Sequence, residues 1–316
     1  MIQVYLPGHY PEIEMSHPDF DIRMLQQEKP GSHIMDIYEG KIITCCSVWW
    51  LGTPEDRDER VGTIGHFYGE DSESAKQILK TACALLAEKG CKRVVAPMNG
   101  NTWRDYRYAV LGMDRRPFLM EPEPAYKRDV FLREYGFSIC EEYGSFIGEL
   151  EKDFIDLEKM DETIRIRALD LDKWDETMEK IYDLSVQCFF QNPYYTSLPK
   201  EEFLKQYGAY KEMVEPNMIL LAYDRKKPVG FLFCMPDYNE RFTGSVKTMI
   251  FKTIGVLPTY QRKHVGRMLV NQAKRNALKA GYTTAITALI HMDNHSKKLC
   301  EGDTLLRQYV LYGKKI

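Results

Sequence analysis

The sequence lacks the features that mark metal-binding, secreted or membrane-spanning proteins. Its eight cysteines are scattered, without a Cys-x-x-Cys pair or a Cys/His cluster at the spacing of a zinc site. No apolar run approaches the roughly 20 residues that a membrane-spanning helix needs. The start, MIQVYLPGHYPEIEM, lacks the basic residues and apolar run of a signal peptide. We therefore expect reduced thiols, no metal, no membrane partner and a cytoplasmic location.

The net charge of the chain gives no reason to expect a polyanionic partner. Its 43 Lys and Arg and 46 Asp and Glu give a formal net charge of -3, so no nucleic acid is expected. Hydrophobic residues make up 44% and charged residues 28%, as in globular proteins with a buried core. A length of 316 residues predicts about two domains.

The first half of the chain contains a predicted strand–helix–strand unit. Residues 33–51 are predicted to form two strands, and residues 72–89 have the apolar spacing of a helix that ends at Gly90. Residues 91–97 then predict a short buried strand. A strand, a helix and a strand in succession form a βαβ unit, so part of the sheet should be parallel.

The second half repeats this order of elements. Strands are predicted at 218–223, 229–235, 248–257 and 283–290, with a helix at 265–280. Both halves also carry Thr-Ile-Gly at similar distances before the glycine that ends the helix. These similarities indicate an internal duplication. With the boundary near residue 160, we predict an α/β (α+β) fold with domains at 1–160 and 161–316, each a mixed, partly parallel sheet flanked by helices.

A cluster of basic residues lies at the predicted start of the second-half helix. The segment 254–267, IGVLPTYQRKHVGR, predicts a strand, a Pro-containing turn and the first turn of a helix. Helix N-termini bind anions, and exposed cations there are unfavourable by about 0.3–1 kcal/mol each. The cluster consists of Arg262, Lys263, His264 and Arg267. It indicates a phosphate or diphosphate ligand; a solvated basic turn is the alternative.

The same segment resembles the acyl-CoA-binding motif of the GNAT acetyltransferase superfamily, which ends in Gln/Arg-x-x-Gly-x-Gly/Ala. Gln261 matches the first position and Gly266 the last, whereas His264 replaces the middle glycine. Either the turn at His264 does not need a positive φ, or the motif is degenerate. The resemblance covers roughly residues 163–316. Residues 97–107 and 131–137 also resemble the N-terminal part of two-domain bacterial GNAT proteins, which implies two tandem GNAT-like domains.

The resemblance implies a site for acetyl-CoA or another acyl-CoA. Backbone amides from Arg262 to Arg267 would bind the diphosphate, the strand at 254–256 would pair with the pantetheine arm, and the Val256 amide would polarise the thioester carbonyl. Asn294 would contact the pantetheine or cap the next helix. The expected cofactor-binding residues are Ile254, Gly255, Val256, Gln261, Arg262, Lys263, His264, Val265, Gly266, Arg267 and Asn294.

The first half should keep the fold without the cofactor site. Its helix begins with Glu70 and Asp71, which stabilise a helix N-terminus without a ligand and would repel a diphosphate. Residues 97–107 are rich in Asn, Trp, Tyr and Arg. We expect these residues either to line the substrate-binding surface or, through Trp103 and Tyr106, to pack between the two halves.

The catalytic groups are less well marked. GNAT enzymes often use a Tyr on the helix after the fifth strand, but residues 294–301 contain none. The remaining candidates include His291 as general base and Tyr309 as general acid. We expect an N-acetyltransferase that moves an acetyl or short acyl group to a primary amine of a small molecule or peptide. A non-catalytic acyl-CoA sensor or scaffold is the alternative.

Overall fold

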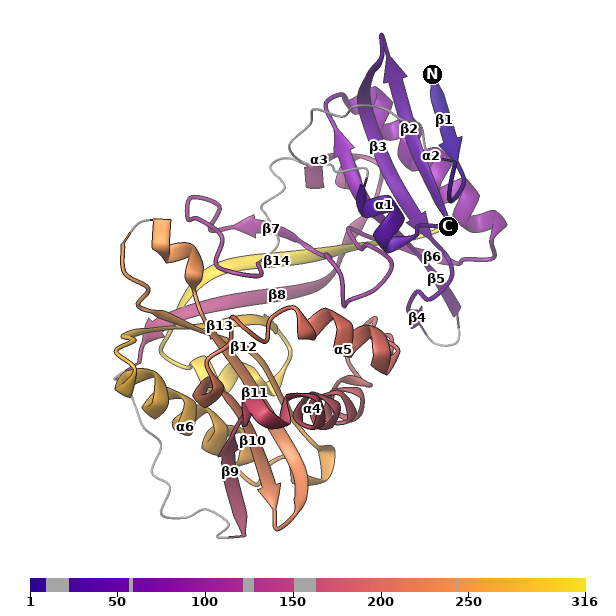
Figure 1. Cartoon of the computed structure of the whole chain (residues 1–316). Helices are drawn as coiled ribbons and strands as arrows, with labels where there is room; N and C mark the ends of the chain where they lie inside the picture. The colour runs from indigo at the N-terminus through magenta and orange to yellow at the C-terminus, as the bar shows by residue number, and fades with distance from the viewer. Residues whose placement is uncertain (10–22, 57–58, 122–127, 151–162, 243) are drawn as a thin grey trace.

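Figure 1 shows a computed structural model of the chain, which describes residues 1–9, 23–56, 59–121, 128–150, 163–242 and 244–316. The first half contains β1 (Ile2–Tyr5), α1 (Arg23–Glu28), β2 (Ser32–Tyr38), β3 (Lys41–Trp49), β4 (Glu55–Asp56), β5 (Glu59–Gly69), α2 (Ser72–Glu88), β6 (Arg93–Ala96), β7 (Tyr108–Leu111), α3 (Arg128–Glu134) and β8 (Ser138–Glu149).

The second half contains β9 (Ile164–Ala168), α4 (Trp174–Phe189), α5 (Lys200–Gly208), β10 (Ile219–Asp224), β11 (Lys227–Pro236), β12 (Thr248–Val256), α6 (Val265–Lys279), β13 (Thr284–His291) and β14 (Thr304–Lys315). Short 3-10 helices are η1 (Leu171–Lys173), η2 (Pro216–Met218), η3 (Tyr238–Phe242), η4 (Pro258–Tyr260) and η5 (His295–Cys300).

The predicted strands and helices occur within a few residues of their expected positions. In both halves a helix connects two parallel strands: β5 pairs with β6 around α2, and β12 pairs with β13 around α6. The remaining pairings in the sheet are antiparallel. The expectation of a mixed sheet built on βαβ units is therefore confirmed.

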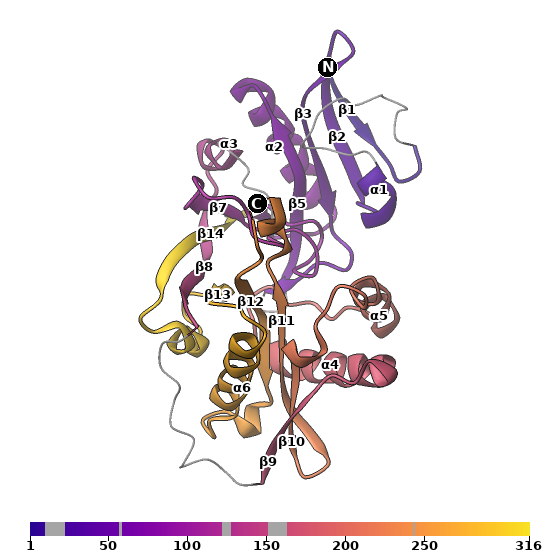
Figure 2. The same ribbon diagram turned by 60° about the vertical axis from the view of Figure 1, so that its left-hand side comes forward.

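The two halves share one sheet because they exchange strands. Its order is β1-β2-β3-β5-β6-β14-β8-β13-β12-β11-β10-β9. Strand β8 belongs by sequence to the first half but pairs with β13, while β14, at the end of the chain, pairs with β6. These two long strands run side by side through the middle of the molecule (Figures 1 and 2). The predicted boundary near residue 160 lies outside the described residues and stays a prediction.

Each half buries a core between its helices and the sheet. In the first half, Ile78 and Leu79 of α2 pack with Ile34 of β2, while Leu25 of α1 packs with the neighbouring Met35. Successive residues of a strand point to opposite faces, so α1 and α2 cover opposite faces of the sheet. In the second half, α4 and α6 lie on opposite sides of the sheet (Figure 2), and a single core joins both helices to β10–β13.

Candidate functional site

A cavity of about 1500 Å³ lies between the two halves. The second half contributes α4 and α5 side chains together with residues from β12 and β13. The first half contributes the end of α1, the loop at 102–107 and residues of β8. Both halves therefore shape one cavity, and the shared strands β8 and β14 fix their relative position.

The cavity opens where β12 and β13 stop pairing. The last parallel pair is Phe251↔Thr287, and the following residues of each strand line the cavity. On the other edge of β12, Leu257 N donates to Val229 O at 2.9 Å. Because hydrogen bonds alternate along an antiparallel pair, Ile254 and Val256 direct their N–H and C=O groups away from β11. The predicted pantetheine-binding edge is thus open toward β13.

The edge of β12 leads to a turn whose amides are also free. Backbone amides of residues 262–267 have no hydrogen-bond acceptor in the described part of the chain, and the first intrahelical bond of α6 runs from Met268 N to His264 O at 3.0 Å. No side chain caps the helix. The first amides of a helix point along its axis. They form a site where a phosphate could accept several hydrogen bonds.

Two residues of this turn adopt left-handed backbone conformations. Arg262 has φ +63° and His264 has φ +62°, a region that costs a non-glycine residue about 1–2 kcal/mol. The interpretation that the turn at His264 does not need a positive φ is therefore wrong. A glycine stands at this position in the motif because it adopts this conformation without strain. Gly266 has space around it: an added Cβ would lie 3.6 Å from Ile254 Cδ1.

The basic residues of the turn have no carboxylate partners. Arg262 and Lys263 are exposed and Arg267 is half-buried, and none forms an ion pair with a described residue. Lys263 Nζ lies 4.8 Å from the centroid of the Tyr260 ring. Val265 is buried and contributes its side chain to the core, so only its amide faces the turn. The cations thus gather at a helix end that repels them and lack an internal counter-charge.

Two further predicted cofactor residues have local contacts. Gln261 is exposed, and its Nε2 lies 3.4 Å from Val256 O. Asn294 is the N-cap residue of η5, and its Oδ1 accepts a hydrogen bond from Ser296 N at 2.9 Å. Of the two roles expected for Asn294, pantetheine contact and helix capping, the structure shows the helix cap.

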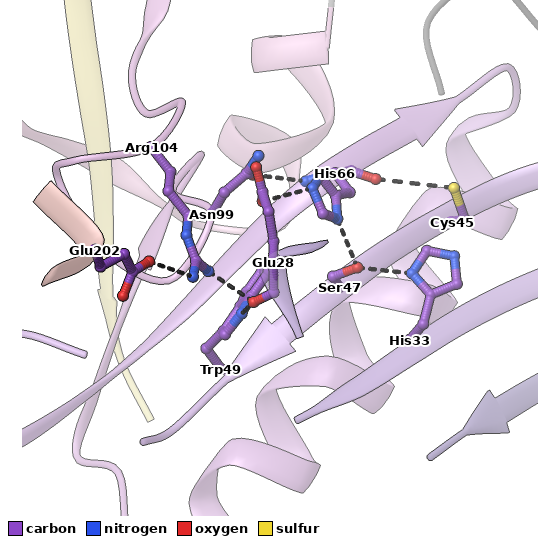
Figure 3. Close-up of polar contacts among 9 residues, drawn as sticks. All are labelled: Glu28, His33, Cys45, Ser47, Trp49, His66, Asn99, Arg104 and Glu202. Atoms are coloured by element: carbon purple, nitrogen blue, oxygen red, sulfur yellow. Dashed lines mark hydrogen bonds and ion pairs between the residues drawn. The ribbon is translucent and has the colours of Figure 1, made fainter. Parts of the chain in front are cut away.

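The first half has closed the equivalent edge with its own atoms (Figure 3). Thr63–Gly65 pairs with β3 as Thr253–Gly255 pairs with β11. There, Met98 N donates to Ile64 O at 2.8 Å. His66 N donates to Asn99 Oδ1 at 3.1 Å, as Figure 3 shows. The groups that correspond to Ile254 O and Val256 N therefore already have partners. Asn99 is also packed against Gly65, where an added Cβ would lie 2.1 Å from Oδ1.

A buried polar chain holds this closed edge in place (Figure 3). His66 Nε2 lies 2.9 Å from a Glu28 carboxylate oxygen and His66 Nδ1 lies 2.9 Å from Ser47 Oγ. The chain continues from Ser47 Oγ to His33 Nδ1 at 2.7 Å. Burial lowers the pKa of His33 to about 3, so this imidazole is neutral. Ser47 and His33 are fully buried, which gives the chain a structural role.

The start of α2 is capped by a carboxylate. Asp71 is the N-cap residue, and its Oδ2 accepts a hydrogen bond from Ser74 N at 2.7 Å. An aspartate cap satisfies one free amide and complements the helix dipole. The acidic start of this helix therefore supplies its cap, and the absence of a cofactor site in the first half stays a prediction.

The proposed base, His291, lies on the cavity wall and is held at both ring nitrogens. Its Nε2 lies 2.6 Å from Glu141 Oε2, and its Nδ1 accepts a hydrogen bond from Asp293 N at 3.2 Å. Because Nδ1 is an acceptor, Nε2 carries the proton and donates it to the carboxylate. The structure thus brings His291 together with Glu141, a residue of β8 that lies 150 positions away in the sequence.

The proposed acid, Tyr309, is fully buried and does not line the cavity. Its hydroxyl lies 3.1 Å from Ser145 Oγ, which accepts a hydrogen bond from Leu289 N at 3.1 Å. The strand opposite carries Tyr143, which pairs with Tyr309 and with His291 across the sheet. Tyr143 does line the cavity, and its hydroxyl has no hydrogen-bond partner among the residues described.

Three cavity residues were not identified as site residues from the sequence. Tyr143 and Arg107 come from the first half and reach the cavity through β8 and the loop before β7. Lys252 lies at an irregularity in β12, where Phe233 and Cys234 pair with Thr253 and Phe251 and leave Lys252 unpaired. Burial, and then the charge of Arg107, lowers the pKa of Lys252 to about 7. The sequence offered one indication of Lys252 as a site residue, because it is a lysine within the apolar run MIFKTIGV.

The aromatic residues expected between the halves both pack and line the cavity. Trp103 Nε1 donates to Thr196 O at 2.7 Å, and the Trp103 ring contacts Tyr195 and Phe203. All three line the cavity, as does Phe189. Phe190 is exposed.

Other site types find no support in the described ranges. No group of three or more His, Cys, Asp or Glu residues there is placed to hold a metal ion. All eight cysteines are free. In the part of the chain that the structure describes, no helix is both long and apolar enough to cross a membrane.

Comparison with known proteins gives one family match, in the second half of the chain. Residues 178–299 match the model of the acetyltransferase (GNAT) family. The comparison with curated proteins gives no match.

Solved structures share the fold of the whole chain. A conserved protein of unknown function from Enterococcus faecalis V583 is 10% identical with a TM-score of 0.57, and the match covers 100% of this chain and 72% of that one. A tandem GNAT protein from the clavulanic acid biosynthesis pathway is 9% identical with a TM-score of 0.50, covering 90% and 82%.

A third match is to the GCN5-related glucosamine N-acetyltransferase region of a fungal multi-domain β-N-acetylglucosaminidase. It is 12% identical with a TM-score of 0.55, and it covers 90% of this chain but 33% of that one. This chain thus spans about a third of that protein. At these identities the matches show the fold alone, and they confirm the predicted tandem GNAT-like architecture.

Proposed function

We propose that the protein transfers an acetyl or other short acyl group directly from acyl-CoA to a primary amine, because residues 178–299 match the model of the acetyltransferase (GNAT) family. The observation that carries the proposal is a continuous open edge, which runs from Ile254 and Val256 to the amides of residues 262–267. This edge ends among cations that form no ion pair with any residue the structure describes. It meets the needs of an extended ligand with a diphosphate at one end.

Acyl-CoA would supply the activated thioester, and the chain's residues would hold and orient it. The amides of residues 262–267 would bind the diphosphate, with charge-assisted contacts from Arg262, Lys263 and Arg267. Ile254 would pair with the pantetheine arm. The Val256 amide would donate to the thioester carbonyl.

The cavity offers groups that could move both protons of the transfer. The attacking amine must lose a proton and the departing thiolate must gain one. The Glu141 carboxylate, oriented by His291, would take the proton from the amine nitrogen. Tyr143 would give its hydroxyl proton to the thiolate sulfur. Burial raises the pKa of Tyr143, while the Arg107 charge acts in the opposite direction, so the hydroxyl is protonated at neutral pH.

The test is a binding assay followed by a turnover assay. Acetyl-CoA should raise the melting temperature of the protein, and a panel of primary amines should then include acceptors that release free CoA thiol. Absence of any thermal shift would refute the cofactor site. Tight acetyl-CoA binding without thiol release across a broad panel would instead favour the acyl-CoA sensor.

The choice between Tyr143 and Tyr309 can be tested with matched substitutions. Tyr143→Phe should lower kcat by about 100-fold, because a positioned acid contributes about 10²–10⁴-fold, and it should leave acetyl-CoA affinity unchanged. Tyr309→Phe removes the same hydroxyl from a position that does not line the cavity and should retain most of the activity. A large loss of kcat in Tyr309→Phe, with little loss in Tyr143→Phe, would instead identify Tyr309 as the general acid.

A further inference from the structure

Arg107 is a buried cation at the cavity wall. It is 8% exposed, and its Cζ lies 3.8 Å from the centroid of the Tyr106 ring and 4.2 Å from that of Tyr143. Its Nε and Nη1 atoms are covered by protein and have no hydrogen-bond partner among the described residues. The two rings attract the charge but leave these donors unsatisfied. The fold alone does not explain why an arginine occupies this position.

Three carboxylates of the cavity wall are paired with groups other than Arg107. They are Glu121 with Arg307 at 3.2 Å, Glu141 with His291 at 2.6 Å, and Glu28 with His66 at 2.9 Å. Asp105 is exposed on the same wall and forms no ion pair with Arg107. The guanidinium therefore lacks an anionic partner within the described residues.

Lys252 is a second basic residue on the cavity wall. Its Nζ donates to Met120 O at 2.7 Å. Burial, and then the charge of Arg107, lowers the pKa of this lysine. Arg107 and Lys252 thus line one partly enclosed cavity, where an anion that reaches the guanidinium would be attracted more strongly than at an open surface.

We infer that Arg107 binds a carboxylate of the acceptor, so that the acceptor is an amine of the amino-acid class. A carboxylate can reach the guanidinium through Nη2, the nitrogen that protein atoms do not cover, in a charge-assisted hydrogen bond. Tyr143 contacts both Arg107 and the His291 ring, with a centroid distance of 5.1 Å to His291. A carboxylate at Arg107 would therefore leave the amine of the same small molecule near the His291–Glu141 pair. This inference rests on the proposed function and narrows its substrate.

The experiment compares amines that differ only by a carboxylate. The pairs are L-lysine and cadaverine, L-ornithine and putrescine, and L-phenylalanine and phenethylamine. Binding of each to the protein saturated with CoA is measured by calorimetry, and thiol release from acetyl-CoA is measured in parallel. In at least one pair the amino acid should bind about 10–100-fold more tightly than its amine, since a charge-assisted pair contributes on that scale. Equal or weaker binding of every amino acid would overturn the inference.

Variants of Arg107 separate carboxylate binding from folding. Arg107→Lys keeps the charge and loses the Nη2 donor, so the preference for the amino acid should fall by at least tenfold while acetyl-CoA affinity stays the same. Arg107→Met should remove the preference entirely by weakening binding of the amino acid, and it should not weaken binding of the matched amine. If both variants still prefer the amino acid to its matched amine, the carboxylate binds at a residue other than Arg107. If a variant does not fold, the comparison of pairs on the wild-type protein still decides the question.

The two readouts distinguish this inference from the proposed function. Turnover of cadaverine or phenethylamine at the rate of the matching amino acid would support acyl transfer and refute the carboxylate site. Arg107-dependent binding of an amino acid without thiol release from any amine would support the carboxylate site and refute acyl transfer.

Discussion

The two halves of the molecule contain equivalent strand edges and helix N-termini. In the first half other residues of the chain occupy their hydrogen-bonding groups, and in the second half these groups are open. In the first half, Asn99 and Met98 occupy the backbone groups of β5 and Asp71 caps α2. In the second half, the corresponding groups of β12 and the first amides of α6 lack partners among the described residues. A duplicated fold therefore does not itself dictate an open site.

The difference shows how a ligand site and a stable scaffold can arise from one architecture. Unpaired backbone groups and cations at a helix N-terminus destabilise the isolated protein, and the first half has eliminated both. The second half retains them, which is expected where a ligand provides the missing partners. The first half instead contributes side chains to the cavity, through β8 and the loop that carries Arg107.

The largest expected effect comes from reversing the charge at the open end. Arg262→Glu with Lys263→Glu should weaken acetyl-CoA binding by at least about 100-fold, because each charge-assisted contact contributes about 1.5–3 kcal/mol. Isothermal calorimetry measures the dissociation constant. The matched control is Lys76→Glu with Lys80→Glu, at exposed positions on α2, which should leave it unchanged.

These two variants test the comparison directly. If the α6 variant bound acetyl-CoA like the parent, the site would lie elsewhere. If the α2 variant lost affinity to the same degree, net charge rather than the local turn would govern binding.

A smaller effect is expected from opening the closed edge. Asn99→Ala removes the acceptor of the His66 amide, and leaving a buried donor unsatisfied costs about 1–3 kcal/mol. Urea unfolding should show this loss, while acetyl-CoA should still bind with a stoichiometry of one per chain. Asn101→Ala, in the same loop but half-buried, should cost less than Asn99→Ala. A second bound acetyl-CoA in the Asn99 variant would mean that the Asn99 side chain alone prevents the first half from binding acetyl-CoA.

The sequence predicts local features of this comparison better than distant ones. The basic turn and the acidic one are visible because their residues are contiguous, and the helices and parallel strands follow from apolar spacing. The exchange of β8 and β14 depends on pairings between residues far apart in the chain. For that reason the positions of Tyr143, Arg107 and Glu141 in the cavity could not be predicted, although 97–107 was expected to serve either the substrate or packing.

The smallest effect should come from His264, where the open end departs from the motif. With φ +62°, His264→Gly relieves backbone strain but makes the unfolded chain more flexible, and we expect a net gain of about 0.5–1 kcal/mol in unfolding free energy. Gln261→Gly is the control: φ there is -63°, so glycine gains no strain relief and should lose about 0.5–1 kcal/mol. Calorimetric acetyl-CoA affinity of the His264 variant should stay within about threefold of the parent, since the amides supply the contacts. A large loss would assign the imidazole a direct role in binding, which would make the departure from glycine a feature of the site rather than a tolerated strain.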